Sequence, residues 1–138
     1  MAERAKVVPL RTVGFWCAII MAAAQATSAV RAFVDPSAFA DYMGLPMGGS
    51  GTSQGFVLVY ALRTTLIAFL AAYLAISGRL RALAVISLVA LILPLGDAWL
   101  SAQAGAPQAI VIRHLGIAAF LGFTSLMLFR ASRMADGS

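Results

Sequence analysis

Four apolar stretches, each long enough to cross a lipid bilayer, dominate this sequence and leave it few ways to fold. We expect helices at about 13–33, 56–77, 82–100 and 109–129. A spanning helix needs about 20 apolar residues, and it bonds its own backbone polar groups where no water is available. The chain is 62% hydrophobic and 11% charged, against about 45–50% and about 25% in soluble domains. The sequence therefore predicts an all-α fold, a membrane four-helix bundle that forms a single integral membrane domain over residues 1–138.

Basic residues mark one side of this bundle. Seven of the ten flank the apolar stretches at the start, in the middle turn and at the end: Arg4, Lys6, Arg11, Arg79, Arg81, Arg130 and Arg133. The 35–55 connection and the 101–108 turn have none. Cytoplasmic loops carry an excess of Lys and Arg, so we expect both termini in the cytoplasm and the chain in a bacterial inner membrane. The expected partner of these charges is the lipid bilayer, and no nucleic acid is expected despite the net charge of +5.

The first connection contains its own structural signals. Asp35-Pro36 should end the first helix, because the residue before proline is disfavoured in the α region. Ser37 to Tyr42 is expected to form a short interfacial helix with Phe39, Tyr42 and Met43 against the membrane. The glycine-rich segment that follows lacks the spacing of a phosphate-binding loop, so we interpret it as a flexible connection.

Three ionisable residues are expected inside the membrane, in its outer half. At about 1.5 Å of rise per residue, Arg63 lies roughly 10 Å from the outer end of its helix, and Asp97 and His114 lie about 5–8 Å from theirs. A charged group at a helix centre costs on the order of 2.5–3.5 kcal/mol on insertion scales and needs a partner. We therefore expect Arg63 to pair with Asp97, aimed by a bend at Pro94. This pair either fixes the register of two helices or belongs to a functional site.

Arg63, Asp97 and His114 are the candidate catalytic residues. Asp97 and His114 would exchange a proton while Arg63 holds an anionic or carbonyl oxygen of the substrate. Because adjacent helical residues point about 100° apart, we place His114 inward and Arg113 at the interface. Further candidate ligand-binding residues, at a similar level, are Tyr60, Thr64, Gln25, Ser28, Arg31 and Trp99. The alternative for each is a simple hydrogen bond between packed helices.

No cofactor and no metal are expected. The chain has one histidine and one cysteine, Cys17, and no HExxH or paired-cysteine spacing. Cys17 lies within an apolar stretch and is interpreted as a small packing residue.

Several short motifs resemble a known family. They are Arg31-Ala-Phe-Val-Asp-Pro36, Phe39, Met43-Gly-Leu-Pro46, Tyr60-Ala-Leu-Arg63, and Asp97 late in the third helix. Together they resemble the small four-helix DoxX-like membrane proteins, in particular a branch of unknown function. The resemblance implies a four-helix bundle in which the Arg63 and Asp97 positions are the signature. The cysteine pairs of relatives with thiol chemistry are absent, which argues against an oxidoreductase role.

These observations favour one function and leave two alternatives open. The favoured one is binding of a small apolar or lipid-like amphiphilic molecule in an outward-facing cavity, with acid/base chemistry of an isomerase, cyclase or hydrolase type. The alternatives are an accessory subunit of a larger membrane complex and a proton-coupled small-molecule transporter. Small residues on the second helix also allow a homodimer.

Overall fold

The computed structural model describes residues 12–47 and 51–136, and every regular element in these ranges is a helix. The elements are α1 (Val13–Val34), α2 (Pro36–Met43), α3 (Gly51–Ile76), α4 (Leu80–Val89), α5 (Ile92–Gln103) and α6 (Gln108–Asp136). Four segments are long and apolar enough to cross a membrane: Val13–Val34, Gln54–Ile76, Leu80–Gln103 and Gln108–Met134. The expected all-α architecture with four spans is confirmed.

The third span is not one continuous helix. A helical residue at position 94 would normally donate its N–H to the Ala90 carbonyl, and Pro94 has no N–H to donate. The helix is interrupted between α4 and α5, and the Ala90 carbonyl accepts a hydrogen bond from the Leu93 N–H at 3.0 Å instead. The expected bend is therefore present, but it begins several residues before the proline.

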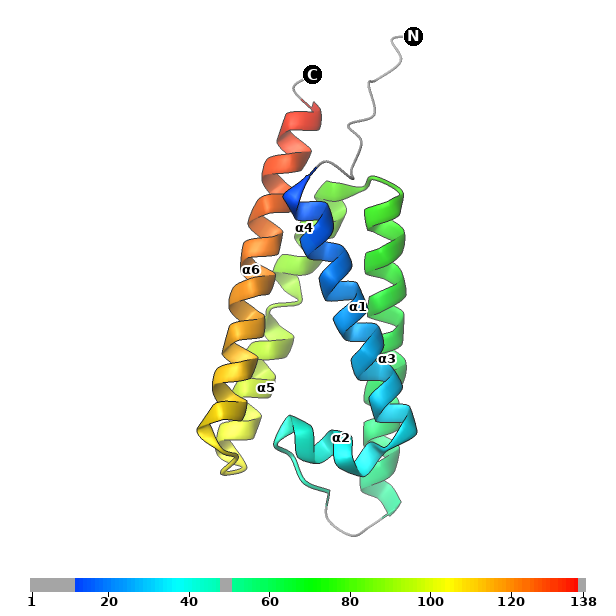
Figure 1. Cartoon of the computed structure of the whole chain (residues 1–138), viewed down its shortest axis with the longest axis vertical. Helices are drawn as coiled ribbons and strands as arrows, with labels where there is room; N and C mark the ends of the chain where they lie inside the picture. Colours follow the sequence, from blue (N-terminus) through cyan, green and yellow to red (C-terminus); the bar gives the residue numbers. More distant parts are fainter. Residues whose placement is uncertain (1–11, 48–50, 137–138) are drawn as a thin grey trace.

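The helices form two groups that meet at one end and diverge at the other (Figure 1). α1 packs along α3, while α6 packs along α4 and α5 and also contacts α1. At the end that holds the α3–α4 turn the two groups converge. At the opposite end they separate, and α2 lies across the opening between them.

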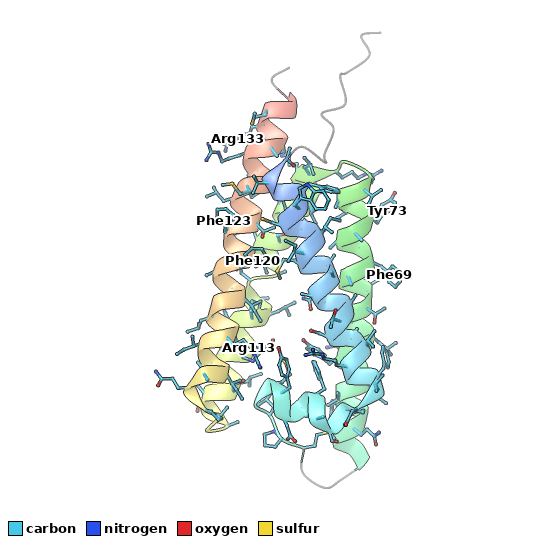
Figure 2. All side chains as sticks on the ribbon, in the orientation of Figure 1. Phe69, Tyr73, Arg113, Phe120, Phe123 and Arg133 are labelled. Atoms are coloured by element: carbon cyan, nitrogen blue, oxygen red, sulfur yellow. The ribbon has the colours of Figure 1, made fainter. Side chains whose placement is uncertain are left out.

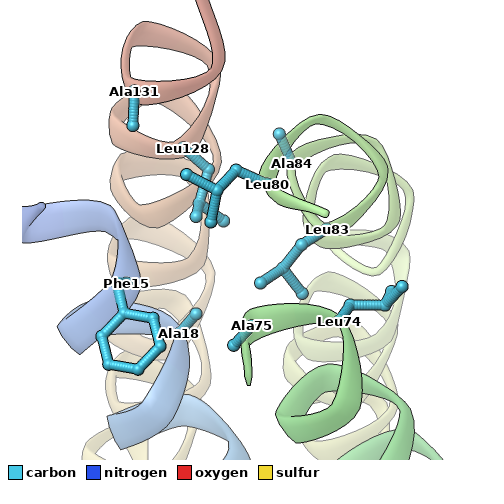
Figure 3. Packing of buried hydrophobic residues seen from close by; sticks show 9 residues of the cluster. All are labelled: Phe15, Ala18, Leu74, Ala75, Leu80, Leu83, Ala84, Leu128 and Ala131. Atoms are coloured by element: carbon cyan, nitrogen blue, oxygen red, sulfur yellow. The ribbon is translucent and has the colours of Figure 1, made fainter. Parts of the chain in front are cut away.

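The converging end holds the larger apolar core (Figure 3). Its buried residues come from four helices: Phe15, Ala18, Leu74, Ala75, Leu80, Leu83, Ala84, Leu128 and Ala131. Gly14 allows α1 and α6 to touch here, since a Cβ at this position would lie 2.9 Å from the Leu128 backbone nitrogen. Close helix contact through small residues is typical of membrane bundles.

The outer faces of the bundle are apolar, as expected for contact with lipid. Phe69, Tyr73 and Phe123 point away from the bundle (Figure 2), and the side chains of Phe69 and Tyr73 are 72% and 58% exposed. Such large exposed apolar surfaces are rare on soluble monomers.

The expectation for α2 is partly wrong. A short helix is present, but the side chains of Phe39 and Met43 are only 4% and 8% exposed, and they pack with Ala32 and Ala61 rather than against the membrane. Tyr42 alone of the three expected residues is exposed. The reason is that the end of α2 is bonded to α5 and α6, which turns its apolar face toward the bundle.

Candidate functional site

Asp35 and Gly44 set the two ends of α2. The Asp35 side chain accepts hydrogen bonds from the Ala38 N–H at 2.9 Å and the Ser37 hydroxyl at 2.8 Å, and these bonds hold the pKa of Asp35 below its usual value. This is the N-cap arrangement that starts a helix. At the other end Gly44 adopts φ +77°, the left-handed conformation that commonly ends a helix.

The last carbonyls of α2 are bonded by side chains from the opposite helix group. The Met43 carbonyl accepts from the Ser101 hydroxyl at 2.8 Å and lies 3.4 Å from His114 Nε2. The Tyr42 carbonyl accepts from the guanidinium of Arg113. The final carbonyls of a helix lack partners within it, and cations are favoured there. We call Ser101, Arg113 and His114 the α2 latch, because they fasten this helix to α5 and α6.

Arg113 also stacks on α2. Its guanidinium carbon lies 3.7 Å from the centroid of the Tyr42 ring, and that of Arg31 lies 5.7 Å from the same centroid. Figure 2 shows Arg113 reaching from α6 toward α2. The structure places Arg113 over the last turn of α2, where cation–π contact stabilises it, and its expected location at the membrane interface stays a prediction.

A pocket of about 400 Å³ opens beside the latch, between α2, the segment that follows it, α3 and α5. Its described lining residues are mostly apolar: Phe39, Ala40, Met43, Leu45, Pro46, Met47, Phe56, Val57, Tyr60, Asp97 and Leu100. This volume lies in the usual range for small-molecule sites, about 300–1,000 Å³. The pocket therefore combines an apolar wall with two polar groups, Asp97 and Tyr60.

Asp97 is half-buried at this pocket and close to two other polar groups. The imidazole of His114 and the phenol of Tyr60 lie near the Asp97 carboxyl group. Tyr60 also lies beside the Thr64 hydroxyl. His114 is only 2% exposed and is not among the lining residues, so Asp97 and Tyr60 are the polar groups that a bound molecule would meet.

The expected pair of Arg63 and Asp97 does not form. Within the described residues no salt bridge joins them, and the Arg63 side chain is exposed on α3. Arg63 follows Ala61, which is fully buried, by two positions, or about 200° around the helix. It therefore points away from the buried face of α3.

The remaining candidate residues are dispersed. Gln25 lines a small cavity of about 60 Å³ in the middle of the bundle. Ser28 is half-buried, Arg31 is exposed beside Tyr42, and Trp99 is 62% exposed. Of the candidates, Asp97 and Tyr60 are in the described pocket lining, His114 and Thr64 are buried beside them, and the others lie elsewhere.

Residues of the site that were not predicted from the sequence include Ser101, Phe39 and Met43. Ser101 was assigned to a turn, although it lies four residues after Asp97 and therefore on the same face of α5. Phe39 and Met43 were placed on the membrane. Their spacing of four residues on a short capped helix was the available signal, because it puts both on one face.

Metal-ligating side chains do not cluster in the described part of the chain. No group of three His, Cys, Asp or Glu residues within residues 12–47 and 51–136 lies close enough to hold a metal ion.

The fold and pocket define a class of protein: a small four-span helical bundle with a short capped helix across one end. A family model described as a domain of unknown function (DUF4267) matches residues 17–128, so the chain belongs to this family. The match contains all the described lining residues of the pocket and the whole latch. No curated protein and no solved structure matches the chain.

Proposed function

We propose that this protein binds a small amphiphilic molecule in the pocket between α2, α3 and α5. The observation that carries the proposal is a cavity of about 400 Å³ with apolar walls and a carboxylate at its edge. Small-molecule sites typically combine an apolar lining with a few polar groups that orient the ligand. The apolar body would rest on Met43, Met47 and Leu100, and the polar end would bond to Asp97.

Binding fits the geometry better than catalysis does. Arg63 is exposed on α3 and outside the pocket lining, so no guanidinium is placed to hold a substrate oxyanion. His114 lies behind the wall with Nε2 directed at the Met43 carbonyl. Asp97 would be the acid/base group that touches the ligand, and His114 would lie behind it without touching the ligand. This geometry supports binding more than catalysis.

We also propose that the chain lies in a bacterial inner membrane with both termini in the cytoplasm, which opens the pocket outward. The basic residues Arg79, Arg81, Arg130 and Arg133 support this orientation. Labelling single-cysteine variants with a membrane-impermeant maleimide, in a Cys17→Ala background, tests it. Gln103→Cys should react in intact cells, and Arg133→Cys should react only after lysis. The reverse pattern would invert the orientation.

A relationship to the DoxX-like proteins is part of this proposal, supported by the short motifs around Arg31, Tyr60 and Asp97. A DoxX-like structure with a short helix fastened across the open end of the bundle would strengthen it. One without a counterpart of α2 would remove it.

A tryptophan that fills the pocket tests the binding proposal. Leu100 and Leu95 lie on α5 with side chains 45% and 49% exposed, and only Leu100 lines the pocket. Native mass spectrometry of protein purified in gentle detergent should show a small-molecule adduct on the wild type and on Leu95→Trp. The adduct should be lost from Leu100→Trp. Equal retention by folded Leu100→Trp, or no adduct on any form, would contradict the proposal.

A further inference from the structure

The charge balance of the pocket narrows the class of its ligand. Among the described lining residues there is one acid, Asp97, and no Lys, Arg or His. The sequence alone suggested the opposite character, with Arg63 holding an anionic oxygen, but Arg63 lies outside the lining. The pocket thus offers a negative group and no positive one to a bound molecule.

The nearest guanidiniums at this end of the bundle are engaged elsewhere. Arg113 donates to the Tyr42 carbonyl and stacks on the Tyr42 ring, and Arg31 approaches the same ring. Within 12–47 and 51–136 the basic side chain beside Asp97 is the buried imidazole of His114, and no salt bridge joins the two. A carboxylate that is partly withdrawn from water is stabilised by a partner of opposite charge or by several donors. A cationic ligand would supply that partner.

Aromatic rings add to the preference for a cation. Phe39, Phe56 and Tyr60 line the pocket, and the rings of Phe39 and Tyr60 lie with their centroids 5.5 Å apart. Aromatic faces attract cations, and ammonium groups are recognised by pairs or cages of such rings. A carboxylate beside two packed rings is thus suited to an ammonium group.

We propose that the pocket takes a hydrophobic ammonium ion, with the cationic head between Asp97, Tyr60 and Phe39 and the apolar chain against Met43, Met47 and Leu100. This inference rests on the proposed function and specifies its ligand class. It excludes neutral and anionic amphiphiles as the preferred ligands.

Three probes of equal chain length test the inference on the unaltered chain. Decyltrimethylammonium is cationic, decanol is neutral and decanoate is anionic. Equilibrium dialysis of radiolabelled probes against full-length protein in a maltoside detergent, with protein-free micelles as blank, measures binding. The dialysis buffer is held at one pH for all three probes. We expect the cation to bind about tenfold more tightly than the other two, a difference of about 1.4 kcal/mol, since bonds to charged groups are stronger than bonds to neutral ones.

Two variants locate the effect. Asp97→Asn should reduce binding of the cation about tenfold, so that the cation no longer binds more tightly than decanol. Asp41→Asn is the matched control, because Asp41 is an exposed acid on α2 that is outside the pocket lining, and it should bind all three probes as the wild type does.

The outcomes separate the two proposals. The ammonium inference is overturned if decanol and the cation bind the wild type equally, or if both variants change binding of the cation equally. Either result leaves amphiphile binding standing. Binding of none of the probes above the micelle blank overturns both.

Discussion

Gly44 is the residue on which the position of α2 depends most. It has φ +77°, and a Cβ there would lie 2.8 Å from the Ala106 Cβ and 3.0 Å from Ile110 Cγ2. A side chain at this position would be strained by its backbone and would also push α2 away from the α5–α6 turn. Gly105 has a similar φ of +71°, yet a Cβ there would meet nothing within 4 Å.

This contrast gives a prediction with its own control. Gly44→Ala and Gly105→Ala should both lose about 1–2 kcal/mol through the left-handed conformation. Gly44→Ala should lose about 1–3 kcal/mol more through overpacking. Unfolding by SDS, followed by circular dichroism, measures the difference. Equal losses would mean that the contact of Gly44 with Ala106 does not hold α2 in place.

At the residue scale the sequence predicted depth better than direction. Asp97 and His114 were placed in the same outer half of the membrane, and the structure brings them near each other. Arg63 was given the wrong partner, because the rise per residue says nothing about the face of a helix on which a side chain lies. Small residues recur every seven positions at Ala61, Ala68 and Ala75, and all three are at most 7% exposed. This recurrence marks the buried face of α3 and would have excluded Arg63 from it.

At the element scale, composition was enough to predict the spans but not their interruptions. Length and hydropathy located the four spanning segments, because these two properties decide whether a helix can cross the apolar core of a bilayer. The break between α4 and α5 depends on which carbonyl loses its donor and how neighbouring residues respond, and Pro94 alone does not specify that. The latch on α2 depends on contacts between residues that are separated by 58 or 71 positions in the sequence. No local sequence pattern reveals such contacts.

The contact between α1 and α6 gives a second prediction. A Cβ at Gly14 would lie within about 3 Å of three backbone atoms of Met127 and Leu128, which cannot rotate away, whereas a Cβ at Gly116 would meet nothing within 4 Å. Gly14→Ala should therefore destabilise the bundle by about 1–3 kcal/mol. Gly116→Ala should stabilise it by about 0.5–1 kcal/mol, as expected within a helix.

The same unfolding measurement decides this case. A neutral or stabilising Gly14→Ala would show that α1 and α6 do not approach each other so closely at the converging end. A destabilising Gly116→Ala would place a neighbour against α6 where the structure has open space.

At the scale of the whole molecule, the bundle is packed at one end and open at the other. The large core joins four helices near the α3–α4 turn, and at the far end α2 is fastened between the separated groups by the latch. Two of the hollows in the described part of the bundle differ in their chemistry. One is the pocket with Asp97, of about 400 Å³. The other is an almost wholly apolar groove of about 530 Å³ between α1 and α3, lined by residues such as Ala23, Phe33 and Phe69.

The groove is suited to lipid chains, because it offers no charged side chain to orient a ligand. A specific amphiphile should instead occupy the pocket, where Asp97 can fix its head. We therefore claim that the pocket, and not the groove, holds a ligand that other amphiphiles of its class can displace.

Photo-crosslinking with a decylammonium probe that carries a terminal diazirine tests that claim most directly. The protein is irradiated in detergent with and without excess decyltrimethylammonium, and labelled residues are mapped by mass spectrometry. We predict that the competed labels lie on the pocket wall, at Met43, Met47, Phe56 or Leu100, while labels in the groove persist under competition. Competed labels confined to the groove, or labelling that no competitor reduces, would contradict the account.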